Sequence, residues 1–81
     1  MTVHAQFYAQ LRDVVGSSIL AIDVAEGANV YDLLETLYSK FPALRVHHKN
    51  ILIGAGVEFV DRNYKLSPGE EISVMPPVQG G

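Results

Sequence analysis

The chain has 81 residues, 48% of them hydrophobic, with nine acidic and six basic side chains, a formal net charge of −3 and no cysteine. This length suits a single domain with its own core, spanning residues 1–81. The excess of acidic side chains argues against a nucleic-acid partner. A membrane span needs about 18 consecutive apolar residues, and no run in the sequence is that long. Disulfides, thiolate metal ligands and cysteine nucleophiles are excluded, and because no signal peptide follows Met1 we expect a cytoplasmic protein.

Two strands are predicted in the first part of the chain. Over residues 2–8 the side chains alternate, with Val3, Ala5 and Phe7 on one face and Tyr8 on the other, which is typical of a half-buried strand. Residues 19–24 alternate in the same way. The intervening segment ends in Gly-Ser-Ser and is expected to be the wide connection of a hairpin.

One helix is predicted over residues 30–40. Asn29 is a good N-cap, and Asp32 lies three residues further on, in the first turn. Pro42 disfavours helical conformation at the residue before it and so ends the helix. Residues 43–49 are expected to be an irregular connection. The apolar stripe of the helix consists of Val30, Leu33, Leu34, Leu37 and Phe41.

The remaining elements are short strands separated by turns. Residues 51–53 form an apolar run typical of a buried strand, and Gly54 and Gly56 after it suggest a bulge or a close backbone contact. Residues 57–60 favour a second short strand, and residues 71–75 a last one. Turns are predicted at 61–63 and 67–70.

This order of elements predicts a two-layer α+β domain, because one helix covers one face of one sheet. It fits the β-grasp, or ubiquitin-like, fold, with a mixed sheet of four to five strands and one main helix on one face. In that fold the first and last strands pair in parallel at the centre of the sheet. Residues 76–81 then form a flexible tail that reaches at most roughly 20 Å when extended, and Pro76 and Pro77 stiffen its base.

The chain resembles the MoaD/ThiS group of sulfur carriers, and within it the small subunits of molybdopterin synthases. The resemblance is carried by an ordered series of motifs and by the Gly-Gly ending. Gly56 departs from it, since the family commonly has Asn there. The motifs are Phe7-Tyr8-Ala9-Gln10-Leu11-Arg12-Asp13, Asn29-Val30-Tyr31-Asp32-Leu33-Leu34, Val57-Glu58-Phe59-Val60, Leu66-Ser67-Pro68-Gly69-Glu70-Glu71-Ile72 and Met75-Pro76-Pro77-Val78-Gln79-Gly80-Gly81.

The resemblance implies a role in molybdenum cofactor biosynthesis in which the carboxylate of Gly81 carries sulfur. A partner adenylyltransferase, related to ubiquitin-activating enzymes, uses ATP to join this carboxylate to AMP. A sulfur-donor protein then displaces AMP and leaves a thiocarboxylate. In the active site of the large synthase subunit, this group gives its sulfur to a pterin precursor. The chain itself is then a carrier and not an enzyme, with no bound cofactor, and Gly80 lets the tail pass through a narrow channel because it has no Cβ.

A surface for these partners is predicted from apolar residues that are out of phase with the core. Tyr8 and Met75 are expected on the helix-free face, because they alternate with Phe7 and Val74 and the end strands are neighbours. Exposed aromatic and Met side chains suit a binding surface. The predicted partner-binding residues are Tyr8, Arg12, Phe59, Met75, Pro76, Pro77, Val78 and Gly80.

Other functions stay open. A related carrier for thiazole, cysteine or tRNA thiolation shares the Gly-Gly ending, although Pro-Pro-Val before it favours the synthase subunit. A ubiquitin-like modifier would instead be linked through Gly81 to a substrate lysine, and a stand-alone interaction module would be indifferent to loss of residues 80–81. No metal site is expected, because His47 and His48 would point to opposite faces of an extended segment.

Overall fold

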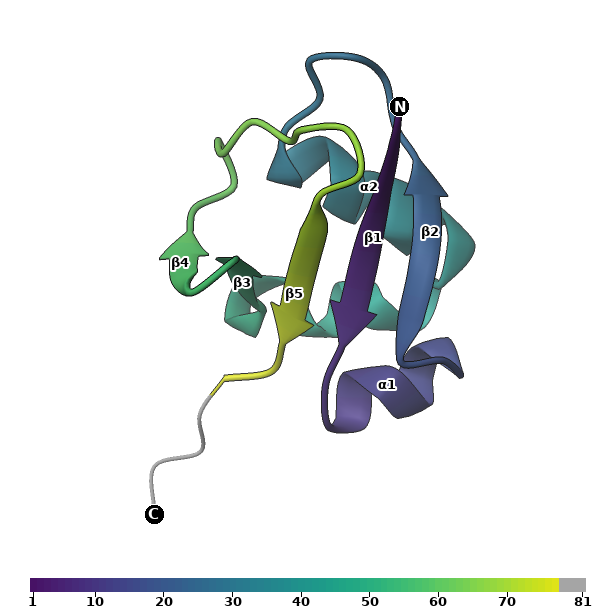
Figure 1. Ribbon diagram of the computed structural model, residues 1–81. Helices are drawn as coiled ribbons and strands as arrows, with labels where there is room; N and C mark the ends of the chain where they lie inside the picture. Colours follow the sequence, from purple (N-terminus) through teal and green to yellow (C-terminus); the bar gives the residue numbers. More distant parts are fainter. Residues whose placement is uncertain (78–81) are drawn as a thin grey trace.

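The computed structural model describes residues 1–77, and five strands within them form one mixed sheet in the order β2-β1-β5-β3-β4 (Figure 1). Helix α2 and the 3₁₀ helix η1 lie behind this sheet in the figure, and the short helix α1 lies at its lower end. The elements are β1 (Thr2–Phe7), α1 (Gln10–Val15), β2 (Ile19–Asp23), α2 (Val30–Lys40), η1 (Pro42–Asn50), β3 (Leu52–Ala55), β4 (Glu58–Val60) and β5 (Glu71–Met75).

The pairing of the strands confirms the predicted β-grasp arrangement. Strands β1 and β5 are parallel neighbours, and the other pairs, β1 with β2, β3 with β5 and β3 with β4, are antiparallel. Because the first and last strands pair in parallel, their C-terminal ends lie at the same end of the sheet. The chain therefore leaves β5 beside the end of β1.

Helix α2 has the bounds that the sequence predicts, and its start is fixed by a capping box. The Asn29 side chain accepts a hydrogen bond from the amide of Asp32, and the Asp32 carboxylate accepts one from the amide of Asn29. Both backbone donors would otherwise lack partners at the helix N-terminus. The helix buries the predicted leucines and also Tyr38, against Val3, Ala5 and Phe7 of β1 and Ile72 and Val74 of β5.

The hairpin with a wide connection predicted for the first two strands is confirmed, and the connection contains a helix, α1, that the sequence did not predict. Leu11 is completely buried and anchors the helix to the core. Gly16 ends it in the left-handed conformation, with φ of 82°, where a residue without Cβ has no steric penalty. At the other end Ala9 has φ of 52°, a conformation that an L-residue with a Cβ rarely adopts.

By contrast, the irregular connection predicted at residues 43–49 is wrong, because the 3₁₀ helix η1 occupies these residues. Pro42 stands at the start of η1, where its missing amide hydrogen costs nothing. The helix buries Leu44 and exposes Val46. Nine residues is long for a 3₁₀ helix, since its hydrogen bonds are poorly aligned, so we expect side-chain contacts to support it.

Gly54 and Gly56, the two glycines in and after β3, differ in what they do for the fold. Gly54 lies in regular pairing with Ser73 and Phe59, so the bulge suggested there is absent. Gly56 instead turns the chain into β4 with φ of 64°.

Within residues 1–77, no helix combines the length and the hydrophobicity that crossing a membrane requires.

Candidate functional site

The base of the C-terminal tail lies where β1, β5 and α1 meet. Phe7 and Val74 form the last parallel pair of β1 and β5. Beyond it the amide of Tyr8 donates a hydrogen bond to the carbonyl oxygen of Val74 at 3.3 Å. Tyr8 is 39% exposed, whereas Phe7 and Val74 are buried. The backbone pairing thus places Tyr8 next to Met75 at the base of the tail, as predicted.

Residues 76 and 77 continue from β5 away from the sheet (Figure 1). Both are prolines of intermediate exposure, and their fixed φ favours an extended chain. The predicted site residues Val78, Gly80 and Gly81 lie outside the described residues. The structure therefore places the start of the tail at the end of the sheet where α1 also lies.

The sheet face opposite α2 presents one row of side-chain positions that crosses all five strands. The register places Ile19 beside Gln6, Gln6 beside Ser73, Ser73 beside Gly54, and Gly54 beside Phe59. Because side chains alternate along a strand, this row faces away from the buried residues of the core. Phe59 is 71% exposed and Ile19 is 45% exposed, so the row has apolar side chains at both ends.

A second row lies one step nearer to the tail. It pairs Met75 of β5 with Leu52 of β3, and Leu52 is partly exposed. Leu52 was predicted to be buried, but alternation with Ile53 turns it outward. Met75, Leu52 and Phe59 together form a helix-free apolar face close to the base of the tail, which suits contact with a protein partner.

Between these residues the face is hollowed. The hollow has a volume of about 170 Å³ and lies over Gly54, between Met75 and Phe59. Glu58 is the charged residue in its lining. The complete lining consists of Gly54, Gly56, Val57, Glu58, Phe59, Ser73 and Met75.

Arg12 does not belong to this hollow. It is exposed on α1 and lines a separate depression with Asp13, Gly16, Ser17 and Ser18. Since α1 lies at the end of the sheet from which the tail leaves (Figure 1), Arg12 lies at that end of the molecule but outside the apolar face. The predicted group of partner-binding residues is therefore divided between two separate surfaces.

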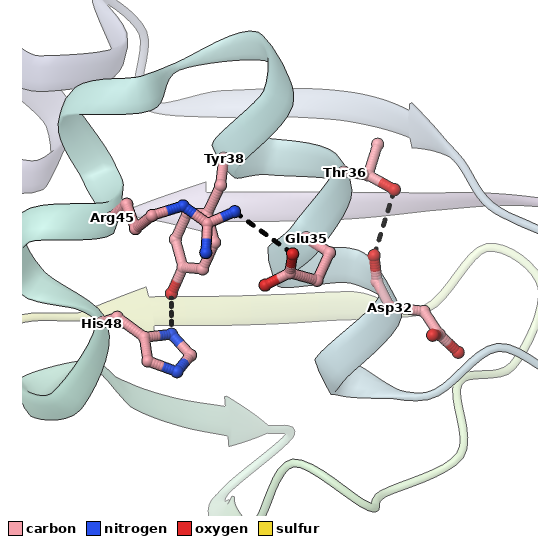
Figure 2. Close-up of polar contacts among 6 residues, drawn as sticks. All are labelled: Asp32, Glu35, Thr36, Tyr38, Arg45 and His48. Carbon is pink, nitrogen blue, oxygen red and sulfur yellow. Dashed lines mark hydrogen bonds and ion pairs between the residues drawn. The ribbon is translucent and has the colours of Figure 1, made fainter.

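On the opposite side of the molecule, polar contacts hold η1 against α2 (Figure 2). The Tyr38 hydroxyl and Nδ1 of His48 share a hydrogen bond of 2.7 Å. The Arg45 guanidinium lies 4.8 Å from the centre of the Tyr38 ring and forms an ion pair with Glu35 at 3.2 Å. Arg62 donates to the carbonyl oxygen of His48 at 2.6 Å.

These contacts give His48 a structural role. Both His47 and His48 lie in a 3₁₀ helix and not in the extended segment expected from the sequence. Burial raises the pKa of the Tyr38 phenol above its ordinary value, and the guanidinium groups of Arg62 and Arg45 oppose that shift. No group of three or more His, Cys, Asp or Glu side chains placed to hold a metal ion occurs within residues 1–77.

The sequence reasoning missed Leu52, Val57 and Gly54 as parts of the exposed face. Val57 is fully exposed in the turn between β3 and β4. For Gly54 a signal was present, because a glycine within an apolar strand often marks close approach of another group. What the arrangement offers is a hollowed, partly apolar face beside the base of the C-terminal tail, which suits contact with a protein partner.

Three comparisons relate the chain to known proteins. A sequence model of the ThiS family matches residues 5–81. A molybdopterin synthase sulfur carrier subunit from Chlamydomonas reinhardtii is 29% identical over 83 residues, which cover 100% of both chains.

Solved structures agree with the fold. The crystal structure of SAMP1 from Haloferax volcanii is 29% identical and superposes with a TM-score of 0.87 over 100% of both chains. The solution structure of the small archaeal modifier protein 1 from Methanosarcina acetivorans is 28% identical, with a TM-score of 0.82 over 99% of this chain and 96% of that one.

Proposed function

The chain belongs to the ThiS family, and from this membership we propose that it is the sulfur carrier subunit of a molybdopterin synthase. The observation that carries the proposal is the extent of the likeness. The family match runs through Gly81, and the algal sulfur carrier subunit aligns over its whole length. The likeness therefore includes the terminal glycines on which such a function depends.

The chemistry proceeds at the α-carboxylate of Gly81, which is ionised at neutral pH. An adenylyltransferase joins this carboxylate to the α-phosphate of ATP and releases pyrophosphate. Sulfur at the oxidation level of hydrogen sulfide, delivered by a sulfur-donor protein, then attacks the carbonyl carbon of the acyl-adenylate, and the bond to AMP breaks to leave a thiocarboxylate. The carrier needs no thiol of its own for this step, which agrees with the absence of cysteine.

Transfer then takes place on the large subunit of the synthase. The thiocarboxylate sulfur passes to a pterin precursor, and the carrier returns with an ordinary carboxylate. The fold supports this role in two ways. Pro76 and Pro77 extend the chain away from β5 (Figure 1), and the apolar face with Met75, Phe59 and Leu52 lies beside the base of the tail. A partner bound to that face is within reach of the tail.

A protein modifier is the second candidate, because two solved structures of 28–29% identity are named SAMP1, the small archaeal modifier protein 1. The first step is the same activation of Gly81, but the acyl group passes to the amine of a substrate lysine and forms an isopeptide bond. Carriers for thiazole, cysteine or tRNA thiolation share the thiocarboxylate and differ in the acceptor. The acceptor thus separates the candidates.

Reconstitution tests the proposal directly. The chain is thiocarboxylated chemically at Gly81 and mixed with a large synthase subunit and the pterin precursor. Formation of dithiolene-bearing molybdopterin, with one carboxylate form of the carrier released for each sulfur transferred, supports the synthase subunit. A carrier that is competent with another thiolation enzyme and inert with several active large subunits would contradict it.

A further inference from the structure

Gly54 is a glycine that the backbone does not require. It lies within β3, paired with Ser73 on one side and Phe59 on the other. The glycines with positive φ within residues 1–77 are Gly16, Gly27, Gly56 and Gly69, and Gly54 is not among them. A glycine inside a strand weakens it, since the unfolded chain has more freedom to lose and no side chain packs.

The missing side chain opens the hollow between Met75 and Phe59. A Cβ built on Gly54 would lie 3.2 Å from Cε of Met75 and 3.5 Å from Cβ of Ser73. The Cβ would therefore occupy the floor of the hollow, and the tip of Met75 would have to shift. With glycine at this position the hollow keeps its volume of about 170 Å³, and its lining combines apolar Met75, Phe59 and Val57 with polar Ser73 and Glu58.

We propose that this hollow is a socket for one aliphatic or aromatic side chain of the large synthase subunit, with Gly54 as the residue that keeps it open. The inference rests on the proposed function, which supplies the partner. The walls are Met75 and the exposed ring of Phe59. A small pocket on an exposed face, with apolar side chains such as these as its walls, suits an apolar anchor residue of a partner.

The position of the socket explains why the occupant belongs to the protein that receives the tail. Met75 forms one wall of the socket and is also the last residue of β5, after which the tail begins. A partner that holds the tail must cover the surface next to Met75. Binding of an anchor side chain in the socket would then fix the register of the carrier on the large subunit and direct the tail.

Filling the socket from Gly54 tests the inference without removing any contact. In the intact chain, Gly54→Ala and Gly54→Val add one and three carbon atoms to the floor of the hollow. Thermal unfolding should show an unchanged or raised Tm for the alanine variant, because alanine is less costly than glycine in an element interior and the Met75 tip is flexible. Affinity for the purified large subunit, measured by calorimetry, should fall about tenfold for alanine and further for valine.

Two further variants make the result specific. Ala21→Val adds the same kind of bulk at an exposed position of β2, opposite His4 and away from the socket, and should leave the affinity unchanged. Ser73→Val fills the hollow from β5 and should weaken binding even if Gly54→Val fails to fold. The proposed function fails, and this inference with it, if the wild-type chain does not bind the large subunit.

Three outcomes would overturn the socket alone. The first is wild-type affinity for the large subunit in a folded Gly54→Ala variant. The second is weakened binding to the activating adenylyltransferase with unchanged binding to the large subunit. The third is loss of self-association of the free chain in the alanine variant, again with unchanged binding to the large subunit, which would assign the hollow to a second copy.

Discussion

The amide of Tyr8 donates to the carbonyl oxygen of Val74 at 3.3 Å, which extends the parallel pairing of β1 and β5 by one hydrogen bond toward the tail. The bond holds the chain after β1 beside Met75, while Ala9, with φ of 52°, turns it into α1. The end of β1, helix α1 and the base of the tail thus meet at one end of the sheet. The proposed docking face and the base of the tail therefore lie at the same end of the sheet.

Replacing Tyr8 tests that edge as a binding surface. Tyr8→Ala should lower affinity for the large subunit about tenfold, because an exposed aromatic ring contributes most of its contact area to a partner. The Tm should also fall, because Tyr8 is only 39% exposed in the free chain and its covered part loses contacts, so the affinities are measured well below the Tm of each variant. Tyr31→Ala, at an exposed tyrosine of α2, is the matched control and should bind normally. Equal losses in both variants would contradict the assignment.

The terminal glycines are tested by adding a Cβ to the tail. Gly80→Val should leave the fold unchanged, yet slow sulfur transfer about 100-fold or more, because the side chain prevents the reacting group from reaching its position. The measurement is single-turnover transfer from carrier thiocarboxylated in advance. Gln79→Ala is the control with an intact Gly-Gly end. Normal transfer by Gly80→Val would refute the narrow-channel argument.

The capping box predicts a loss of stability that is independent of function. Asn29→Ala removes the acceptor for the Asp32 amide and should lower the free energy of unfolding by about 1 kcal/mol. Urea denaturation of the variant and of Asn50→Ala, an exposed position at the end of η1, provides the comparison. A loss of the same size at Asn50 would mean that the cap has no special role.

The contact between Tyr38 and His48 predicts a stabilising role for the phenol hydroxyl. Tyr38→Phe keeps the ring beneath Arg45 but removes the hydrogen bond of 2.7 Å to His48. The free energy of unfolding should fall by about 1 kcal/mol, the usual net value of one such bond. Hydrogen exchange in η1 should accelerate more than in β1. Unchanged protection of η1 would show that the bond does not hold this helix.

The same hydroxyl predicts the alkaline behaviour of the fold. Burial raises the pKa of Tyr38 in the folded state above its ordinary value, so the folded state keeps the proton more tightly than the unfolded chain. This stabilisation is complete below about pH 10 and is lost as the pH rises through the folded pKa. The free energy of unfolding should therefore decrease above about pH 10, and Tyr38→Phe should reduce the slope. An unchanged slope would contradict this origin.

Much of the fold follows from sequence pattern, because its strands and α2 have strong local signals. The alternation at Val3, Ala5 and Phe7 and the cap at Asn29 each predict an element that the structure contains. Two helices escaped prediction. Helix α1 has one turn and a half, includes β-branched Val14 and Val15, and depends on tertiary burial of Leu11. Such a segment has little helical propensity to detect.

The site was predictable in part. Tyr8 and Met75 follow from strand phase, which left Phe59 undecided, and parallel pairing of the end strands brings Tyr8 and Met75 together. The hollow over Gly54 was not predictable, because it depends on the cross-strand register that places Gly54 between Ser73 and Phe59. Register is a property of the assembled sheet, and no local pattern specifies it across five strands.

The central claim is that the carboxylate of Gly81 carries sulfur. Its most direct test is the intact mass of the full chain purified from cells in which the pathway is active, with fragmentation to locate any change. The account predicts a population in which one oxygen at Gly81 is replaced by sulfur, and its loss when the activating adenylyltransferase is deleted. An unmodified Gly81 carboxylate in all molecules, or Gly81 found solely in isopeptide bonds to lysine, would contradict it.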